Sequence, residues 1–544
     1  MTANAPQHPL DQQLAALLQR LGGIAPEQLP LLSSFIQRLS SKTREGVIAV
    51  PRQVWLDEDW QALCSLSVVG KPGEYKPIIA NDHYAWLYRY WQYEQRLAQG
   101  LAQRIKPIKR PAHAWDDLQT QAVQLALQQA FLIISGGPGT GKTTTVTRIL
   151  AELIQQGKAG HRILLAAPTG KAAMRMQEAI QHTSQRLQLD AQIIAQLPKQ
   201  AQTLHRLLGY RPLQTSFWHS AQNPLAADVV IIDEASMIDI AMMTHLVEAV
   251  PPSAKLILLG DKDQLASVET GSIFRDLCAG TALAQHTIVL QKSYRFAATD
   301  GVGQLAKAIQ TADALRLLEV LDTADYATVS LNETQAGLEL DWLKQAWQAY
   351  IQAVKANQLT DAFQAFNAMR ILTPLRKGKQ GAEALNAWID TAIQRLMPPV
   401  ANRRPWYVGR PIMVTQNDYQ QNLFNGDVGI SLLDTQGQLK VYFAGEQAGQ
   451  FRAIAPVRLP AHETAWAMTI HKSQGSEFDK VLLILPEAEE SGLLGRELLY
   501  TAVTRAKTQV EIWAKRSTLL KALQQVTPPS SQIDTHLKQL MPTL

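Results

Sequence analysis

Short apolar runs, each followed by a polar or glycine-rich turn, mark the strands of a first α/β domain. They are Phe131–Ser135, Arg162–Ala167, Asp228–Ile232 and Lys255–Leu259, with segments of helical pattern between them. Strands that alternate with helices predict a parallel sheet with helices on both faces. In such a sheet the functional residues gather just beyond the carboxyl ends of the strands, so those turns are the first places to search for chemistry.

A second set of strand-length apolar runs lies in the C-terminal half and predicts a second α/β domain. Within it, the Gly-, Asp- and Gln-rich piece around 410–460 has β-hairpin character and predicts a small inserted barrel. The expected strands are Arg370–Thr373, Pro411–Thr415, Gly429–Leu433, Leu439–Phe443, Ala467–Ile470, Val481–Leu485 and Gln509–Ala514.

The first 105 residues or so have a helical pattern, with leucines at helical spacing between Leu14 and Leu21. An aromatic-rich stretch, His83–Glu94, has the spacing of a buried helix. We therefore expect its rings to pack in a core or against a partner subunit, and a base-stacking surface is the alternative. The segment Ile105–Trp115, with its prolines and basic residues, is typical of a linker.

Composition narrows the class of protein without identifying it. The chain has 544 residues, and its 46% hydrophobic content suits several cores and excludes a disordered chain. A net charge of +5 fits a polyanionic partner but is common among proteins without one. Two cysteines, Cys64 and Cys278, with no CxxC pair, argue against a zinc site or a disulfide framework. Neither a signal-peptide pattern nor an apolar run of ~18 residues occurs, so we expect a cytoplasmic protein.

The clearest chemical motif follows the strand Phe131–Ser135. It matches the phosphate loop GxxxxGK[ST], between an apolar strand and a helical pattern, as this motif requires. Glycines let backbone N–H groups close around phosphates, and the helix N-terminus adds positive potential. Lys142 is expected to contact the β- and γ-phosphates and the Thr143 hydroxyl to bind Mg²⁺. The residues expected to bind nucleotide here are Gly136, Gly137, Pro138, Gly139, Thr140, Gly141, Lys142, Thr143 and Thr144.

Two carboxylates, Asp233 and Glu234, directly follow the strand Asp228–Ile232. Asp233 is expected to hold the Mg²⁺ shell, and Glu234 to orient or deprotonate the attacking water. Alone, such a pair is about as often a helix N-cap, but the phosphate loop upstream favours the catalytic interpretation. Together the two motifs predict hydrolysis of ATP or GTP and leave open what the hydrolysis drives.

Three further polar residues are typical of a motor. Gln264, after the strand Lys255–Leu259, is expected to contact the γ-phosphate and report its loss. Arg295 follows the next apolar run, and Arg505 lies near the end of the second domain. Arginines that reach the phosphates from a facing domain stabilise charge in the transition state. A lone arginine is more often part of a surface salt bridge, so each gains weight only from the others.

In order and spacing these motifs resemble those of the superfamily 1 helicases. The resemblance covers about residues 116–515 and implies two RecA-like P-loop motor domains, with ATP and Mg²⁺ as nucleotide and cofactor. It also implies that Gln119 reads the adenine base. Besides the phosphate loop, its segments are Gln119–Val123, Ala167–Ala172, Thr203–His205, Asp233–Ser236, Gly260–Leu265, Ser293–Arg295, Ile371–Arg376, Ala467–Gly475 and Tyr500–Lys507.

The expected fold class is therefore α/β. We expect two motor domains, each a parallel sheet with helices on both faces. In addition, we expect a helical N-terminal domain and a small β-rich insertion in the second motor domain. The expected boundaries are 1–110 for the N-terminal, partner-docking domain, 111–290 and 291–515 for the motor domains, about 410–460 for the insertion, and 516–544 for a C-terminal tail.

Within the superfamily the details resemble the RecD family. They are Ser135–Val146, Val268–Gly271 with Ile273-Phe274, Asn417-Asp418 with Phe424–Gly429, and Arg496–Tyr500. This resemblance implies a 5′→3′ DNA helicase subunit of a RecBCD-type helicase–nuclease, with RecB-like and RecC-like partners. Single-stranded DNA and duplex ends would be its substrates, in double-strand break repair, recombination and degradation of linear DNA.

The resemblance also implies that single-stranded DNA crosses the top of both motor domains. Small hydroxyls, backbone amides and lysines suit phosphate contact that is independent of base sequence. Ordinary turn chemistry is the alternative for each residue. Those expected to face the DNA are Pro168, Thr169, Lys171, Thr203, His205, Thr469, His471 and Ser473.

Three other functions stay open at this point. They are an ATP-binding regulatory subunit that does not translocate, an RNA helicase of the same superfamily, and a self-sufficient RecD-like helicase. The intact set of Lys142, Glu234, Arg295 and Arg505 argues against the first. The short N-terminal region argues against the last, because RecD-like helicases that act alone usually carry a longer N-terminal extension.

Nuclease chemistry is not expected in this chain. A cation-dependent nuclease needs clustered carboxylates and a lysine, and outside Asp233/Glu234 and Asp261/Asp263 the sequence has no such set. The small acidic run at Glu487, Glu489 and Glu490 is typical of a solvated loop. In a RecBCD-type complex the nuclease site would belong to another subunit.

Overall fold

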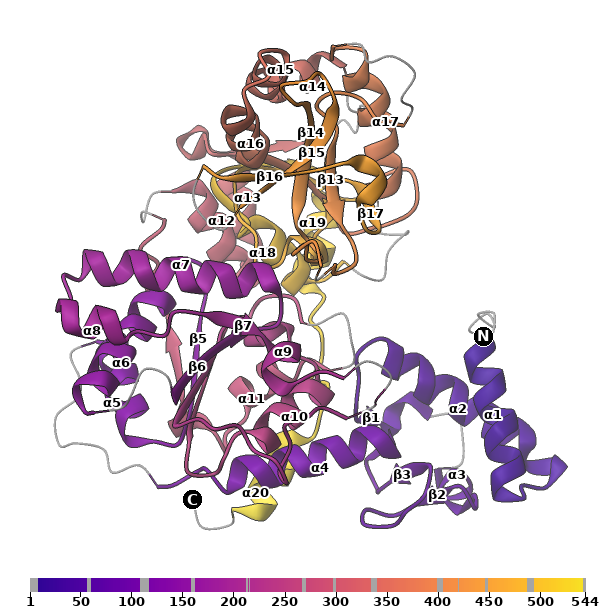
Figure 1. The fold of residues 1–544 in the computed structure, drawn as a ribbon. Coiled ribbons are helices and arrows are strands. Elements are labelled where there is room, and N and C mark those ends of the chain that lie inside the picture. The colour runs from indigo at the N-terminus through magenta and orange to yellow at the C-terminus, as the bar shows by residue number, and fades with distance from the viewer. Residues whose placement is uncertain are drawn as a thin grey trace.

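The computed structural model describes residues 8–55, 60–107, 117–157, 162–211, 214, 216–266, 271–296, 300–333, 340–398, 405–418, 420–445, 449–486 and 494–541. Most of the expected linker Ile105–Trp115, the segment 268–270 and the acidic run at 487–490 lie outside these ranges. Four sheets organise the described residues: one N-terminal, one in each motor domain and one in an insertion (Figure 1).

The first motor sheet has six parallel strands in the order β10-β5-β9-β8-β6-β7. The strands predicted from apolar runs are confirmed, and β7 was missed because its three residues are only half-buried. The bounds are β5 (Phe131–Gly136), β6 (Ile163–Ala167), β7 (Ala201–Thr203), β8 (Val229–Ile232), β9 (Lys255–Gly260) and β10 (Thr287–Leu290).

Helices cover both faces of this sheet, as predicted. Alternate residues of β5 enter different cores: Phe131 and Ile133 pack with α4, α10 and α20, whereas Leu132 and Ile134 pack with α5 and α6. The period-2 alternation of a strand explains this division. The helices of this domain are α5 (Leu118–Gln128), α6 (Lys142–Gln155), α7 (Gly170–Arg186), α8 (Ala191–Gln196), α9 (Leu204–Leu208), α10 (Ile240–Ala249) and α11 (Ile273–Ala279).

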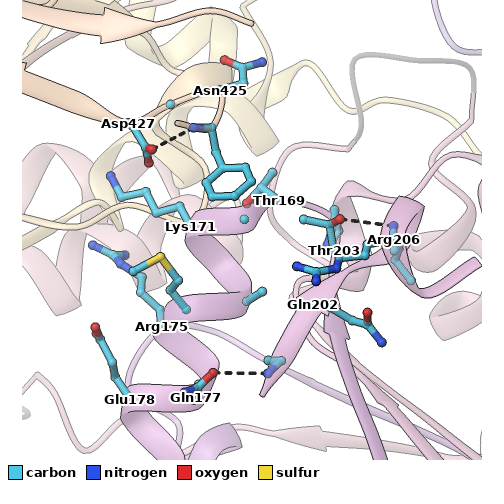
Figure 2. Close-up of a pocket in the computed structure, with 18 of the residues that line it drawn as sticks. Thr169, Lys171, Arg175, Gln177, Glu178, Gln202, Thr203, Arg206, Asn425 and Asp427 are labelled. Atoms are coloured by element: carbon cyan, nitrogen blue, oxygen red, sulfur yellow. Dashed lines mark hydrogen bonds between the residues drawn. The ribbon is translucent and has the colours of Figure 1, made fainter. Parts of the chain in front are cut away.

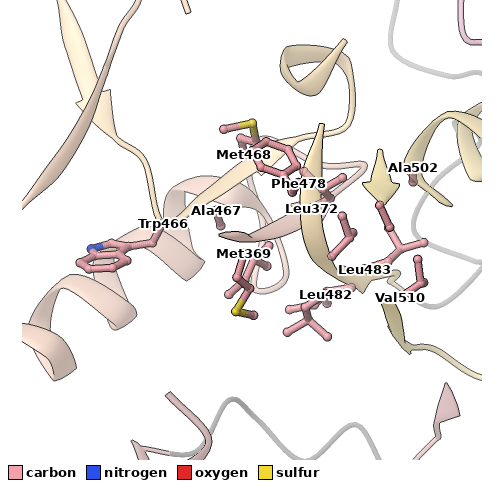
Figure 3. Packing of buried hydrophobic residues seen from close by; sticks show 14 of the residues in the cluster. Met369, Leu372, Trp466, Ala467, Met468, Phe478, Leu482, Leu483, Ala502 and Val510 are labelled. Atoms are coloured by element: carbon pink, nitrogen blue, oxygen red, sulfur yellow. The ribbon is translucent and has the colours of Figure 1, made fainter. Parts of the chain in front are cut away.

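The second motor sheet has five parallel strands in the order β11-β20-β19-β12-β18. Met369, Leu372, Leu482 and Val510 pack across neighbouring strands in its core (Figure 3). The strands are β11 (Val329–Asn332), β12 (Met369–Thr373), β18 (Ala467–Thr469), β19 (Phe478–Ile484) and β20 (Ala506–Trp513). The helices are α12 (Gly301–Gln310), α13 (Ala314–Asp322), α14 (Leu340–Ala346), α15 (Gln348–Lys355), α16 (Leu359–Ala368), α17 (Ala382–Gln394), α18 (Arg496–Val503) and α19 (Arg516–Gln524).

The predicted β-rich insertion is a five-stranded antiparallel sheet in the order β16-β15-β14-β13-β17. It leaves the second domain after α17 and returns at β18. Its small core includes Ile412, Val441 and Phe443. The strands are β13 (Pro411–Val414), β14 (Val428–Leu433), β15 (Leu439–Ala444), β16 (Phe451–Ile454) and β17 (His462–Thr464).

The N-terminal region is mostly helical, as predicted, but it also holds a four-stranded sheet in the order β1-β4-β3-β2 that the sequence did not indicate. The strands have only two to four residues each, too few for a clear period. The helices are α1 (Pro9–Gly22), α2 (Leu29–Arg44), α3 (Trp60–Ser65) and α4 (Tyr88–Ala102); the strands are β1 (Val50–Pro51), β2 (Val69–Gly70), β3 (Ile78–Ala80) and β4 (Tyr84–Leu87).

The aromatic stretch His83–Glu94 is a strand followed by a helix, and the single buried helix expected there is wrong. Trp86 lies in β4 opposite Ile79, whereas Trp91 lies in α4. The prediction that the rings pack in a core is confirmed: Trp86 is buried and donates its indole N–H to Glu94 at 2.9 Å. Cross-strand pairing overrode the helical spacing of the aromatic residues.

The C-terminal segment expected as a tail is folded. After α19 the chain crosses back to the first motor domain, where α20 (Ile533–Leu540) packs on α4 (Figure 1). On the way Ser530 donates its N–H and its hydroxyl to Asp276, at 3.0 and 2.7 Å. The segment after α19 therefore connects the second motor domain to the first motor domain and to α4 of the N-terminal region.

Candidate functional site

The phosphate loop connects β5 to α6 at the carboxyl edge of the first motor sheet. Gly139 and Gly141 have φ of +74° and +87°, in the left-handed region that favours glycine. A Cβ on Gly139 would lie 2.3 Å from the Cβ of Arg295, and one on Gly141 would lie 2.2 Å from Nε2 of Gln119. Both positions thus need glycine, for the backbone conformation and for space. The loop lies directly against Arg295 and Gln119, which were both predicted to act at the nucleotide.

Lys142 begins α6, and its ammonium group donates to the carbonyl oxygens of Gly136 and Gly137. Thr143 and Thr144 follow in the first turn of the helix. Gln119, on α5, donates its amide to the carbonyl of Thr140 at 3.2 Å. The structure therefore brings together the predicted nucleotide-binding residues at the N-terminus of α6, where the helix dipole favours an anion.

Asp233 and Glu234 follow β8, two strands from β5 in the sheet. Burial, reinforced by the charge of Glu234, raises the pKa of Asp233 to about 6, and the charge of Lys142 opposes the rise. Glu234 has a left-handed φ of +53° and donates its N–H to the Asp233 carboxylate at 2.9 Å. The Thr143 hydroxyl and the Asp233 carboxylate are hard oxygen donors, so this set fits Mg²⁺.

We expect kcat/KM for nucleotide hydrolysis to fall about tenfold per pH unit below the pKa of Asp233, which lies near 6. Because this pKa is raised, a proton neutralises the carboxylate at a higher pH than in an ordinary aspartate, and the neutral form binds Mg²⁺ poorly. The measurement is kcat/KM from about pH 5 to 8 at two Mg²⁺ concentrations, where more Mg²⁺ should move the acid limb to lower pH. A flat profile through pH 5 would contradict this assignment.

Arg295 lies over the phosphate loop, where the backbone N–H of Tyr294 donates to the Gly139 carbonyl at 2.7 Å. Its Nη2 donates to Glu477 of the second motor domain at 2.7 Å. Its Nη1 is buried and has no hydrogen-bond partner among the residues that the structure describes. A buried guanidinium N–H beside a phosphate loop fits a phosphate oxygen.

Arg505 approaches the same region from the end of α18. It is 2% exposed and donates to the carbonyl oxygens of Thr501 and Ser476, each at 3.2 Å. Glu477 connects the two arginines. Burial acts to raise the pKa of Glu477, but the charges of Arg295, Arg175 and Arg505 bring it below its ordinary value. An ionised glutamate thus holds a cluster of arginines between the two motor domains.

Gln264 lies in the loop after β9, and its amide donates to Asp261 at 3.0 Å. This loop contacts the second domain directly, because the N–H of Leu265 donates to the Thr501 hydroxyl at 2.7 Å. The predicted γ-phosphate contact is therefore part of the cleft between the motor domains. Of the six residues predicted to be catalytic, all lie around this cleft or the phosphate loop.

A groove of about 1890 Å³ runs between α7 and α9 of the first domain and the insertion and loop 471–476 of the second (Figure 2). Six of the residues predicted to face DNA line it: Pro168, Thr169, Lys171, Thr203, His205 and His471. The hydroxyls of Thr169 and Thr203 accept from Ala172 and Arg206 as helix N-caps. These two hydroxyls therefore also cap helices, which agrees with the alternative interpretation that they stabilise turns.

Two of the residues predicted to face DNA do not line this groove. Ser473 is fully buried, and its hydroxyl donates to the Ile470 carbonyl at 2.7 Å. The Thr469 hydroxyl accepts from the Lys472 N–H at 3.4 Å. Both side chains shape the turn that presents His471, so the prediction of direct contact is corrected for Ser473 because its hydroxyl is turned inward.

Arg175 and Ser476 join the two domains at the groove and were missed in the sequence. Arg175 lies one helical turn after Lys171 on α7 and donates to the Gly475 carbonyl at 2.5 Å. Lys171 donates to the Ser476 hydroxyl at 2.8 Å. Burial lowers the pKa of Lys171 to about 7. The i, i+4 spacing of the two cations was the available signal, but only the tertiary structure supplies their partners.

Comparisons with known proteins agree with this architecture. The AAA domain family matches residues 119–270, and the UvrD-like helicase C-terminal domain family matches residues 464–512. The RecBCD enzyme subunit RecD of Mycolicibacterium smegmatis is 39% identical over 86% of this chain and 84% of its own length. The chain belongs to the RecD family. The family resemblance deduced from its motifs is thereby confirmed.

A second RecD relative, the RecBCD enzyme subunit RecD of Haemophilus influenzae, is 33% identical over 89% of this chain and 85% of its own length. Among solved structures, that of a Pif1 helicase described as unwinding DNA at a fork matches 79% of this chain and 98% of its own, at 18% identity with a TM-score of 0.43. The RecD relatives and the two family matches show that the chain is an ATP-dependent DNA helicase of superfamily 1. Its two parallel sheets have the predicted α/β motor fold. Within the described residues, no helix is long and apolar enough to cross a membrane.

Proposed function

We propose that this RecD-family chain is an ATP-driven motor that moves 5′→3′ along single-stranded DNA within a RecBCD-type helicase–nuclease. In that role it acts in the cytoplasm in double-strand break repair, recombination and degradation of linear duplex DNA. RecB-like and RecC-like subunits are its partners, and the nuclease site lies outside this chain. The names of its relatives support the assembly, and the geometry of the cleft supports the motor.

One residue carries the motor proposal, because it contacts both sites. The carbonyl oxygen of Ser476 accepts from Arg505 at the nucleotide cleft, and its hydroxyl accepts from Lys171 in the groove. A change in the position of Arg505 during hydrolysis therefore reaches Lys171 in the groove through the single residue Ser476. Direct coupling of this kind is what a translocating ATPase needs and an ATP-binding switch does not.

At the nucleotide, Lys142 and the loop amides bind the phosphates, and Gln119 reads the base. Thr143 and Asp233 are the residues that would hold Mg²⁺, which supplies charge neutralisation at the phosphates. Glu234 orients the attacking water and takes its proton. Arg295 and Arg505 offset the negative charge that develops in the transition state, and Glu477 sets the position of Arg295.

In the groove, the walls suit a sugar–phosphate backbone more than individual bases. Arg206 supplies positive charge, Lys171 adds to it when it is protonated, and the N-terminus of α7 lines the groove with its partial positive charge. Phe424 from the insertion packs 3.3 Å from the position of a Cβ on Gly170 and closes the groove from the second domain. Contacts of this type give binding that is independent of base sequence.

A leucine row on α1 is the proposed partner-docking surface. Leu10, Leu17 and Leu21 are 58%, 43% and 70% exposed, and they share one face of the helix. Large apolar side chains that are exposed together on one helix face favour an interaction site. The location agrees with the sequence-based expectation that the N-terminal domain docks a partner.

The test is ATP hydrolysis by the purified chain with and without single-stranded DNA, together with unwinding of duplexes that carry a 5′ or a 3′ tail. We expect DNA to stimulate hydrolysis and the 5′-tailed duplex to be unwound preferentially. If activity is absent, the assay is repeated with co-expressed RecB-like and RecC-like subunits. If single-stranded DNA does not change the rate of ATP hydrolysis, either for the chain alone or with its partner subunits, the motor proposal is contradicted. That result would favour a regulatory ATP-binding subunit.

A further inference from the structure

The loop Asp261–Leu265, which carries the predicted γ-phosphate contact, is held by the second motor domain at three points. The hydroxyl of Tyr500 donates to Asp261 Oδ2 at 3.1 Å. The N–H of Leu265 donates to the Thr501 hydroxyl, and its carbonyl accepts from Gln474 Nε2, both at 2.7 Å. Both ends of a five-residue loop of one domain are thus set by side chains of the other.

Asp261 connects the cross-domain contact to Gln264. The same oxygen, Oδ2, accepts from Tyr500 Oη at 3.1 Å and from Gln264 Nε2 at 3.0 Å. A carboxylate only accepts hydrogen bonds, so the NH₂ end of the glutamine amide must face it. This leaves the carbonyl oxygen and the second N–H of Gln264 as the groups available to a water or a phosphate oxygen.

The surroundings keep Tyr500 protonated, and the burial of both side chains shields their hydrogen bond from water. Burial, together with the charge of Asp261, raises the pKa of Tyr500 well above its ordinary value, so the phenol stays a donor. Burial also raises the pKa of Asp261, and the charge of Lys142 opposes the rise. Asp261 is 2% and Tyr500 5% exposed, so water does not compete readily for their hydrogen bond.

Tyr500 also touches the phosphate loop itself. A Cβ on Gly137 would lie 2.6 Å from the Tyr500 hydroxyl, so only glycine leaves room for the phenol. The ring is anchored in the core of the second domain, on α18, five residues before Arg505. A movement of this helix therefore shifts the phenol against the loop and against Asp261 together.

We propose that Tyr500 and Asp261 are a positioning pair across the cleft, which sets the amide of Gln264 for hydrolysis only when the second motor domain is docked. The pair rests on the proposed function, since it needs the cleft to hydrolyse ATP. The pair makes the orientation of the Gln264 amide, the predicted γ-phosphate contact, depend on the second motor domain. Hydrolysis is thereby tied to the domain arrangement and not to nucleotide binding alone.

The decisive experiment replaces Tyr500 with phenylalanine, which removes the hydroxyl and retains the ring. In the full-length chain with single-stranded DNA, we expect kcat of ATP hydrolysis to fall about tenfold, as for loss of a hydrogen bond to a charged group, and KM for ATP to change less than about twofold. The acid limb of the kcat–pH profile should move to higher pH, because the pKa of Asp261 rises when its carboxylate loses a donor.

A double-mutant cycle with Gln264→Ala tests whether Tyr500 acts through Gln264. We expect Tyr500→Phe to have almost no further effect on kcat in the Gln264→Ala chain. The matched control is Tyr407→Phe, since Tyr407 is a buried tyrosine of the same domain that donates to Asp390 away from the cleft. It should retain the wild-type kcat even if its melting temperature falls.

Wild-type kcat in Tyr500→Phe, or effects that add to those of Gln264→Ala, would overturn the positioning pair and leave the motor proposal in place. A wild-type chain that does not hydrolyse ATP with DNA, alone or with its partners, would overturn the proposed function and the pair together. If Tyr500→Phe does not fold, Asp261→Leu tests the same pair because leucine cannot accept either hydrogen bond, and a normal kcat there would also overturn it.

Discussion

Replacement of Lys142 by glutamine is expected to abolish ATP hydrolysis and unwinding while the fold stays intact. The ammonium group at the start of α6 lies against the phosphate loop, where it donates to the carbonyl oxygens of Gly136 and Gly137. Glutamine retains a donor but removes the charge that offsets the β- and γ-phosphates. We expect kcat to fall by at least about 10²–10³-fold, measured as phosphate release with saturating single-stranded DNA.

The matched control for this variant is Lys255→Gln. Lys255 belongs to the same domain and likewise donates to two backbone carbonyls, those of Leu127 and Gln129, but it lies at the amino end of β9. This control should keep wild-type hydrolysis. Turnover with normal DNA stimulation in the Lys142→Gln chain would show that the phosphate loop is not the hydrolytic site.

Replacement of Arg505 by alanine is expected to retain nucleotide binding and to lose hydrolysis. Its guanidinium is buried between the domains and held by two carbonyl oxygens, so its charge is fixed in place before the reaction. Preorganised charge stabilises the transition state more than the ground state. We expect kcat to fall by roughly 10³–10⁵-fold, the range for trans-acting arginines.

Binding and hydrolysis are measured separately for this variant. The Kd of a fluorescent non-hydrolysable ATP analogue should change less than about threefold while phosphate release is lost. Arg516→Ala is the control, because Arg516 is an arginine of the same domain whose partners, Asp322 and Glu333, lie at the surface. Loss of analogue binding in Arg505→Ala would mean that this residue maintains the cleft and does not act on the transition state.

The motor cores could be predicted from the sequence because their signals are local. Buried parallel strands appear as continuous apolar runs, and the phosphate loop depends on glycines whose backbone conformations few other residues adopt. The strands β5, β6, β8 and β9 were therefore placed correctly, and the residues from Gly136 to Thr144 run from the end of β5 into α6 as expected. The small N-terminal sheet was not, because strands of two to four residues carry no measurable period.

Partners across the cleft could not be predicted, because they depend on how two separately folded domains meet. Glu477 lies 182 residues from Arg295, and Tyr500 lies 239 residues from Asp261, yet each pair is hydrogen-bonded. Nothing in the neighbouring sequence of either residue indicates such a partner. The inward turn of the Ser473 hydroxyl was likewise set by a local carbonyl that motif spacing does not reveal.

The sequence by itself thus determined the family, the two motor domains and the nucleotide loop, since each depends on residues close together in the chain. Only the tertiary structure decided which arginines share Glu477, which groove residues contact the opposite domain, and that Asp261 joins Gln264 to Tyr500. The physical reason is that hydrogen bonds and charge pairs act over a few ångströms in space. Sequence separation carries no information about that distance once the chain has folded into domains that face each other.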